Sequence, residues 1–157
     1  MSKPDFSIVE IIENLHIYGL SKKSSDRVQA GDIQTLANKY HEIINKNSGE
    51  VIPFFVLSKD YNERTKEFDL FVGGLIENNA LEIFVIPKGL YGKSTIKPKW
   101  GFLWGLSIGE AKRTFYTGWL PKSDYTALNM EYEYHTEISK GRNPTIDILS
   151  AVRKRAL

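Results

Sequence analysis

Two acidic side chains that lie among apolar and aromatic residues are the positions best suited to chemistry in this sequence. Glu133 stands between two tyrosines, and Asp147 stands between two isoleucines. Burying an unpaired carboxylate is costly, and a cationic ligand relieves that cost. In a desolvated site, contact between the cation and an aromatic ring adds about 2 kcal/mol. The two positions therefore predict a binding site for positively charged aromatic compounds.

Side-chain alternation along the same strands supplies further ligand-binding candidates. If residues 129–137 and 145–153 are strands, one face of them is mixed, partly acidic and partly apolar. The candidates on this mixed face are Glu133, His135, Asp147 and Leu149. Phe55 and Phe71 match the mixed face in the first half of the chain. We expect the opposite, all-apolar face to pack against helices and the mixed face to line a cleft.

Five aromatic side chains complete the set of ligand-binding candidates. Trp100 and Trp104 lie in a loop rich in glycine and tryptophan, where they either close the pocket or anchor the loop on the core. Tyr116 is expected to face the cleft from a helix. Tyr18 and Tyr91 each precede a glycine, which indicates related positions in two halves of the chain. For each of these residues the alternative is ordinary core packing.

Two helices and a series of strands are expected to position these side chains. Apolar residues recur at helical spacing on one face of segment 26–46. A second helix is expected at 108–120, which Pro121 ends because proline lacks a backbone donor. The strand segments are 6–12 with 15–23 (one strand or a bent pair), 51–59, 67–77, 81–97, 129–137 and 145–153. Gly73-Gly74 predicts a bulge or bend that curls the sheet.

The second half of the chain repeats the layout of the first. Three pairs of segments correspond: 17–20 with 90–93, 54–57 with 132–135, and 68–72 with 146–150. This predicts an α+β fold in which duplicated strand-helix-strand-strand units form a curved, mostly antiparallel sheet. Two main helices are expected on one face, with a ligand cleft between pseudo-symmetric halves. We expect a single domain over 1–157, with repeats at about 5–78 and 81–153.

Composition excludes several classes of protein and site. The net charge of +2 is too small and dispersed for a nucleic-acid footprint. There is no cysteine, and the three histidines lack metal-ligand spacing, so neither a metal nor a cofactor is expected. No secretory signal or membrane-spanning run is present, which favours a cytoplasmic protein that contacts no membrane. The oligomeric state stays open between monomer and dimer, because an exposed edge strand pairs readily with another copy.

The run from Gly109-Glu110-Ala111 through Phe115 to Tyr125 resembles the helix-to-loop motif of GyrI-like small-molecule-binding domains. Segments 132–135 and 146–152 resemble the last two strands of that family. The resemblance covers residues 81–153 and is looser in the first half. The domain is also similar to the effector-binding module of multidrug-sensing transcription activators. The resemblance implies a central pocket that takes planar, aromatic and often cationic compounds.

The resemblance also implies roles for individual residues. Glu133 occupies the place of the family's pocket carboxylate, and Asp147 that of a second acid found in some relatives. His135 and Leu149 fall on pocket neighbours. Many relatives have a tryptophan in the helix where this chain has Lys112 or Arg113, and this difference bears on the size and charge of the ligand.

Three functions are compatible with these features. The first, which we favour, is a stand-alone, low-specificity binder of amphipathic aromatic cations that acts as a sensor or a sequestering protein. The second is a hydrolase of cyclopropane-bearing genotoxins, in which a pocket acid positions water or stabilises developing charge. The third is a protein-interaction module such as a gyrase modulator. No nucleophile–base pair or phosphate-binding loop requires an enzyme, so no catalytic residue is assigned.

Overall fold

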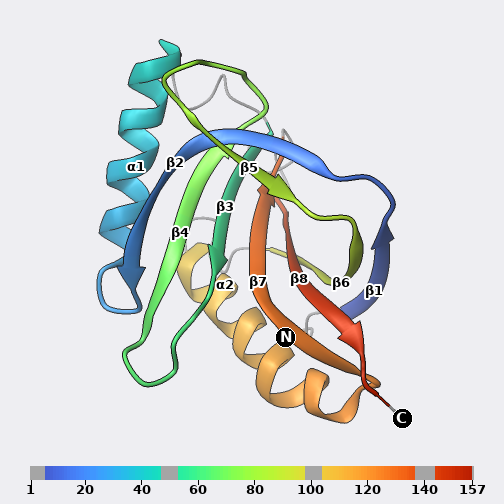
Figure 1. The fold of residues 1–157 in the computed structure, drawn as a ribbon. Helices are drawn as coiled ribbons and strands as arrows, with labels where there is room; N and C mark the ends of the chain where they lie inside the picture. Colours follow the sequence, from blue (N-terminus) through green and yellow to red (C-terminus); the bar gives the residue numbers. More distant parts are fainter. Residues whose placement is uncertain (1–5, 47–52, 98–103, 137–143, 157) are drawn as a thin grey trace.

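The computed structural model describes residues 6–46, 53–97, 104–136 and 144–156, with the side chains of 104–106 excepted. Within these residues, eight strands form one antiparallel sheet that curls into a half-barrel, and two helices cover its outer face (Figure 1). The expected α+β class, with both helices on one face of a curved antiparallel sheet, is confirmed. No helix among the described residues has the length and apolar character needed to cross a membrane.

Most elements follow the predicted segments, but the strand expected at 129–137 begins at Tyr125, and the second helical run continues through Pro121 to Lys122. The strands are β1 Phe6–Ile11, β2 Leu15–Ser25, β3 Phe54–Lys59, β4 Glu67–Gly74, β5 Glu82–Ile86, β6 Gly89–Ile96, β7 Tyr125–His135 and β8 Ile146–Lys154. The helices are α1 Gln29–Ile44 and α2 Trp104–Arg113, and α2 continues as a π-helical turn, Thr114–Trp119, and a 3₁₀ turn, Leu120–Lys122. The segment 81–97, read as one strand-like stretch, forms two strands, β5 and β6.

The strands of the two halves occupy equivalent positions on either side of the centre of the sheet. The order is β1-β6-β8-β7-β3-β4-β2-β5, so each strand of one half has a counterpart in the other. This is the arrangement expected of two duplicated strand-helix-strand-strand units. β1 pairs with β6, and β5 pairs with β2, so the first strand of each half joins the sheet of the other half. Of the two alternatives for 6–12 and 15–23, the structure shows two strands, β1 and β2, separated by residues 12–14.

The two faces of the sheet have separate cores. The inner face of the half-barrel carries an apolar cluster formed by Ile17, Phe55, Leu57, Phe71, Ile86, Tyr91, Tyr132, Leu149 and Ala151. On the outer face, α1 packs Leu36 against Val56 and Val72, and α2 packs Ala111 against Ile148. The predicted apolar face of β3 and β4 does pack against a helix, so the face assignment in the first half is confirmed.

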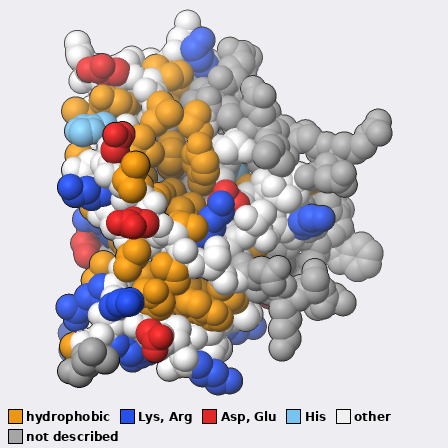
Figure 2. Space-filling view, turned by 90° about the vertical axis from the view of Figure 1, so that its right-hand side faces the viewer, with side chains coloured by type: hydrophobic (Ala, Val, Ile, Leu, Met, Phe, Trp, Pro, Cys, Tyr) orange, Lys and Arg blue, Asp and Glu red, His pale blue; other side chains and the backbone are white. Residues whose placement is uncertain are grey.

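The half-barrel is open between its edge strands β1 and β5. Figure 2 views the molecule from the side on which β1 lies in Figure 1 and shows apolar side chains along the middle of this face, with single charged side chains among them. β5 contributes two of the exposed apolar side chains, Ile83 and Val85.

Two glycines allow β2 and β4 to approach closely where the sheet curls. Gly19 lies opposite Gly73 in the register of these strands. A Cβ atom on Gly73 would lie 2.1 Å from the carbonyl oxygen of Tyr18, and one on Gly19 would lie 1.8 Å from that of Val72. Both obstacles are backbone atoms, which cannot rotate away. A side chain at either position therefore requires the two strands to separate.

We predict that Gly73→Ala lowers the free energy of unfolding by about 2 kcal/mol or more, because the added methyl group forces the strands apart. The matched control is Gly31→Ala in α1, where a Cβ meets nothing within 4 Å. That change replaces glycine by a better helix former and is expected to be neutral or stabilising by up to about 1 kcal/mol. Urea unfolding followed by circular dichroism measures both, and equal midpoints for the two variants would contradict the close-approach argument.

Candidate functional site

Glu133 lies on the outer face of the sheet, beneath the helices. In the antiparallel register its neighbours are Val56 on β3 and Ile148 on β8, both in outer-face clusters. Tyr132 instead pairs with Leu149, and both belong to the inner cluster. The predicted face assignment of β7 is therefore wrong: its glutamates lie on the helix-covered face, and its tyrosines face the inside of the half-barrel.

The physical reason is the length of a turn. From Lys59 to Asp69 the chain makes the turn between β3 and β4, and the register pairs these two residues. The corresponding pair in the second half is Tyr134 and Asp147. Tyr134 and Asp147 are 13 positions apart in the sequence, whereas Lys59 and Asp69 are 10 positions apart. The second turn is therefore three residues longer than the first. Because side chains alternate along a strand, an odd difference in length moves every side chain of the matched strand to the other face.

Glu133 is the centre of a group of charged side chains that joins β7 to α2. It is 8% exposed. One carboxylate oxygen lies 3.1 Å from Nε2 of His135, and the other lies 3.9 Å from Nζ of Lys112 in α2. Lys112 also lies 3.6 Å from Glu131. Two carboxylates and one ammonium group therefore meet beneath the helix. We call Lys112, Glu131, Glu133 and His135 the β7 charge cluster.

The charges in this cluster shift the pKa of its members in opposite directions. Burial by itself raises the pKa of Glu133, but the contacts with His135 and Lys112 outweigh that effect and hold the pKa below its ordinary value. Burial lowers the pKa of Lys112, yet the neighbouring Glu131 and Glu133 carboxylates reverse this and raise it. Both groups are therefore held in their charged forms in a poorly solvated place.

A π-helical turn places a tyrosine next to this cluster. Tyr116 lies in the turn Thr114–Trp119 that follows α2. Its pKa is raised, first by burial and then by the negative charge of Glu131. Phe115 is buried, with Trp119 stacked on it at 5.4 Å between ring centroids. The turn thus buries one aromatic residue in the core and brings the next one beside the carboxylates, as π-turns often do near functional sites.

Ring contacts connect the β7 charge cluster to the other helix. His135 lies 6.2 Å from Phe54 of β3, and Phe54 stacks on His41 of α1 at 5.8 Å between ring centroids. Burial lowers the pKa of His41, which favours its neutral form. Contacts therefore run from α1 through Phe54, His135 and Glu133 to α2.

Buried polar atoms without a hydrogen-bond partner occur in the same region. Among the described residues they include Oε2 of Glu131 and Nε2 of His41. An unsatisfied buried polar atom costs free energy, so each one in a folded protein calls for an explanation such as a bound molecule. A ligand that donates hydrogen bonds here would remove part of this cost.

The structure brings three predicted site residues together and separates the others. Glu133, His135 and Tyr116 lie in or beside the β7 charge cluster. The predicted residues on the inner face are Phe55, Phe71, Tyr91, Leu149 and Asp147. Tyr18 packs on the outer face in the cluster of α1 residue Tyr40. Trp100 lies outside the described residues, as does the side chain of Trp104.

Asp147 does not share a face with Glu133. It accepts a hydrogen bond of 2.6 Å from the hydroxyl group of Thr95 and lies 3.8 Å from Nζ of Lys93. The proposed equivalence of Tyr18 and Tyr91 is also wrong, because Tyr91 is buried in the inner cluster whereas Tyr18 faces α1. The match rests on the glycine that follows each tyrosine, and it aligns β2 with β6 one position out of register. A shift of one position along a strand places the matched side chains on opposite faces of the sheet.

Sequence reasoning missed two members of the cluster. Glu131 shares the alternation of Glu133, so a strand pattern alone was sufficient to find it. Lys112 was considered only as a departure from a family pattern. Nothing in the spacing of the sequence brings α2 over β7, so its role required the structure.

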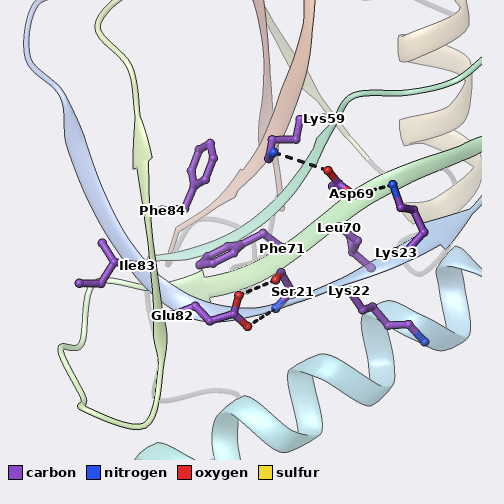
Figure 3. Close-up of a pocket in the computed structure, with 10 residues that line it drawn as sticks. All are labelled: Ser21, Lys22, Lys23, Lys59, Asp69, Leu70, Phe71, Glu82, Ile83 and Phe84. Atoms are coloured by element: carbon purple, nitrogen blue, oxygen red, sulfur yellow. Dashed lines mark hydrogen bonds and ion pairs between the residues drawn. The ribbon is translucent and has the colours of Figure 1, made fainter.

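A separate pocket of about 390 Å³ opens on the inner face (Figure 3). At one end Asp69 pairs with Lys23 at 3.0 Å and with Lys59 at 3.6 Å. At the other, Glu82 accepts hydrogen bonds from the backbone N–H and the hydroxyl group of Ser21, at 3.0 and 2.6 Å. Both carboxylates therefore already have partners within the protein. The β7 charge cluster, which has an unsatisfied carboxylate oxygen, is therefore the stronger candidate site.

Comparison with known proteins shows the fold. No family model and no curated protein matches the sequence. The integron cassette protein VCH_CASS2 of Vibrio cholerae is similar in structure, with a TM-score of 0.66, 16% identity and coverage of 96% of this chain and 98% of that one. SAV2435 bound to tetraphenylphosphonium has a TM-score of 0.65 and 11% identity, and the match covers 95% of this chain and 94% of that one. The EcmrR C-terminal domain has a TM-score of 0.60 and 15% identity, and the match covers 97% of this chain and 99% of that one. At these identities the likeness shows that this chain shares the fold of these proteins, as the sequence resemblance implied.

The lowered pKa of Glu133 predicts a contribution to acid sensitivity. Since the folded pKa lies below the ordinary value of 4.5, the stability that this group contributes is present above that value and is lost as the pH falls through the folded pKa. We expect the free energy of unfolding to fall less between about pH 6 and about pH 3 in Glu133→Gln than in the wild type.

Urea unfolding at several pH values measures this dependence. Glu63→Gln is the matched control, because it removes the same type of charge from an exposed turn. The control should retain the wild-type pH dependence. An unchanged dependence in Glu133→Gln would show that the cluster does not hold the carboxylate in its charged form.

Proposed function

We propose that this protein is a low-specificity binder, a sensor or sequestering protein, of amphipathic aromatic and often cationic small molecules. The ligand's positive group would bind at the carboxylates of Glu131 and Glu133 on the outer face of the sheet. The single observation that carries the proposal is this pair of carboxylates in a poorly solvated place, with one Glu131 oxygen lacking a hydrogen-bond donor.

The charge balance of the cluster favours a cationic ligand. Glu131 and Glu133 face a single ammonium group, that of Lys112. Lys112 balances the charge of only one of the two carboxylates. Solvent screens buried charges less than exposed ones. A cation that pairs with these carboxylates therefore gains more free energy than it would at the protein surface.

The surroundings of the cluster favour an aromatic body on that cation. Three aromatic side chains lie around the cluster. Tyr116 of the π-turn lies beside Glu131, Phe54 of β3 lies beside His135, and His41 of α1 stacks on Phe54. Flat apolar surfaces of this kind stack on ligands of varied shape, and their faces attract positive charge. Low specificity is expected, because neither stacking nor the attraction of one charge requires a particular ligand outline.

The structural likeness supports the same class of ligand. SAV2435, which shares the fold, has been solved with tetraphenylphosphonium. This compound carries one positive charge within four aromatic rings. An identity of 11% shows a shared fold and no more. The proposal that this chain binds such a ligand therefore rests on its own carboxylates.

Titration with tetraphenylphosphonium, rhodamine 6G and ethidium tests the proposal. We expect binding of more than one of these cations, and a loss of affinity of about tenfold or more in Glu133→Gln, since that change removes a poorly solvated charge next to the ligand. Asp147→Asn is the matched control, because it removes an acidic group from the opposite face. Its affinity should remain within about twofold of the wild type, a change of less than about 0.5 kcal/mol.

Neutral and anionic dyes of similar size provide the second control. They should bind more weakly than the cations, because they leave the carboxylates unpaired. The proposal would be wrong if no cation bound, or if Glu133→Gln bound the cations as tightly as the wild type. A loss in Asp147→Asn alone would move the site to the inner face.

A further inference from the structure

We infer that Lys112 is a resident counter-ion of the ligand site, which a ligand's positive group must displace in order to bind. The inference rests on the proposed function and adds a specificity-determining residue to it. Lys112 occupies the only position among the described residues from which an ammonium group contacts both Glu131 and Glu133. A cationic ligand that pairs with these carboxylates competes for that place.

The contacts of Lys112 with its two carboxylates are longer than a hydrogen bond. Its Nζ lies 3.6 Å from Glu131 and 3.9 Å from Glu133. Lys22 and Asp32, by contrast, are separated by 2.8 Å, which is a hydrogen-bonded distance. Lys112 therefore supplies charge to the cluster but does not fill the hydrogen-bonding capacity of either carboxylate.

The unsatisfied oxygen of Glu131 is an independent sign that this pairing is incomplete. Oε2 of Glu131 is buried without a donor although an ammonium group lies nearby. A ligand able to donate a hydrogen bond to this atom would gain an interaction that Lys112 leaves unmade. Replacing Lys112 by such a ligand is then an exchange of one cation for a better-placed one.

The side chain of Lys112 is able to leave its place. It extends from α2 on a flexible four-carbon stem, and 23% of it is exposed, so its ammonium group has a route to solvent. Its displacement has a cost, since Lys112 loses the attraction that raises its pKa. Each cationic ligand must offset this cost, so Lys112 lowers the affinity for all cations and selects those with the strongest additional contacts.

The test compares two substitutions that remove the same charge from adjacent positions. Lys112→Met removes the resident cation and keeps an apolar stem of similar length. Arg113→Met removes the neighbouring exposed cation, which lies outside the cluster. Isothermal titration with ethidium, a cation whose amino groups donate hydrogen bonds, should show that Lys112→Met lowers the Kd by about tenfold or more, as expected for a close charge contact. Arg113→Met should change it by less than about threefold, as expected for an exposed charge.

Lys112→Arg provides a second variant with the opposite expectation. Arginine keeps the charge, and its planar fork matches a carboxylate better than an ammonium group does. A more firmly paired resident cation should raise the Kd for ethidium above the wild-type value. Circular dichroism at the titration temperature establishes that each variant is folded, and the arginine variant keeps the test decisive if the methionine variant does not fold.

The outcomes separate this inference from the proposed function. If the wild type binds and Lys112→Met binds no better than Arg113→Met, or if Lys112→Arg binds more tightly than the wild type, the resident-cation inference is overturned and the proposed function stands. Binding by Lys112→Met but not by the wild type would support a resident counter-ion and would contradict the proposed function of the natural chain. If neither the wild type nor any Lys112 variant binds a cation, the proposed function is wrong and the inference fails with it.

Discussion

The burial of two carboxylates beneath a helix is the interaction on which the candidate site depends. A carboxylate in that position is tolerated only where positive charge or hydrogen-bond donors compensate for lost hydration. For Glu133 this compensation comes from His135 and Lys112, and it is strong enough to lower the pKa despite burial. For Glu131 it is incomplete, because one oxygen has no donor. The site is thus charged, poorly solvated and only partly satisfied, which suits it to a ligand of the opposite charge.

The curled sheet separates this site from the rest of the acidic and aromatic side chains. The inner face of the half-barrel is filled by its own apolar cluster, with Phe55 and Tyr132 packed ring against ring at 5.9 Å. The outer face instead carries the charged groups, beneath α2, which contributes Lys112. Because the two helices meet this region through His41 and Lys112 respectively, movement of either helix would alter the site.

Under the proposed function, competition between an internal cation and an external one would give the site a simple means of discrimination. A protein that binds many aromatic cations through one carboxylate has few contacts with which to reject weak ligands. An ammonium group that already occupies the carboxylates sets a minimum strength for any competitor. In this chain α2 supplies that group from Lys112, on the same helix that leads into the turn carrying Tyr116.

The sequence by itself determined the elements and the chemistry of the site. Its periodicities gave both helices and most strands, and the tyrosines around Glu133 marked a carboxylate in an unusual setting. What only the tertiary structure decided was which face each strand presents. The turn before β8 is three residues longer than its counterpart in the first half. Matching 54–57 with 132–135 therefore assigns the side chains of β7 to the wrong faces and wrongly places Glu133 on the same face as Asp147. Strand periodicity fixes which residues alternate, but the side they face depends on the register of pairing with neighbours far away in the chain. The contact between Lys112 and Glu133 depends on how α2 packs on the sheet, and no local pattern encodes that packing.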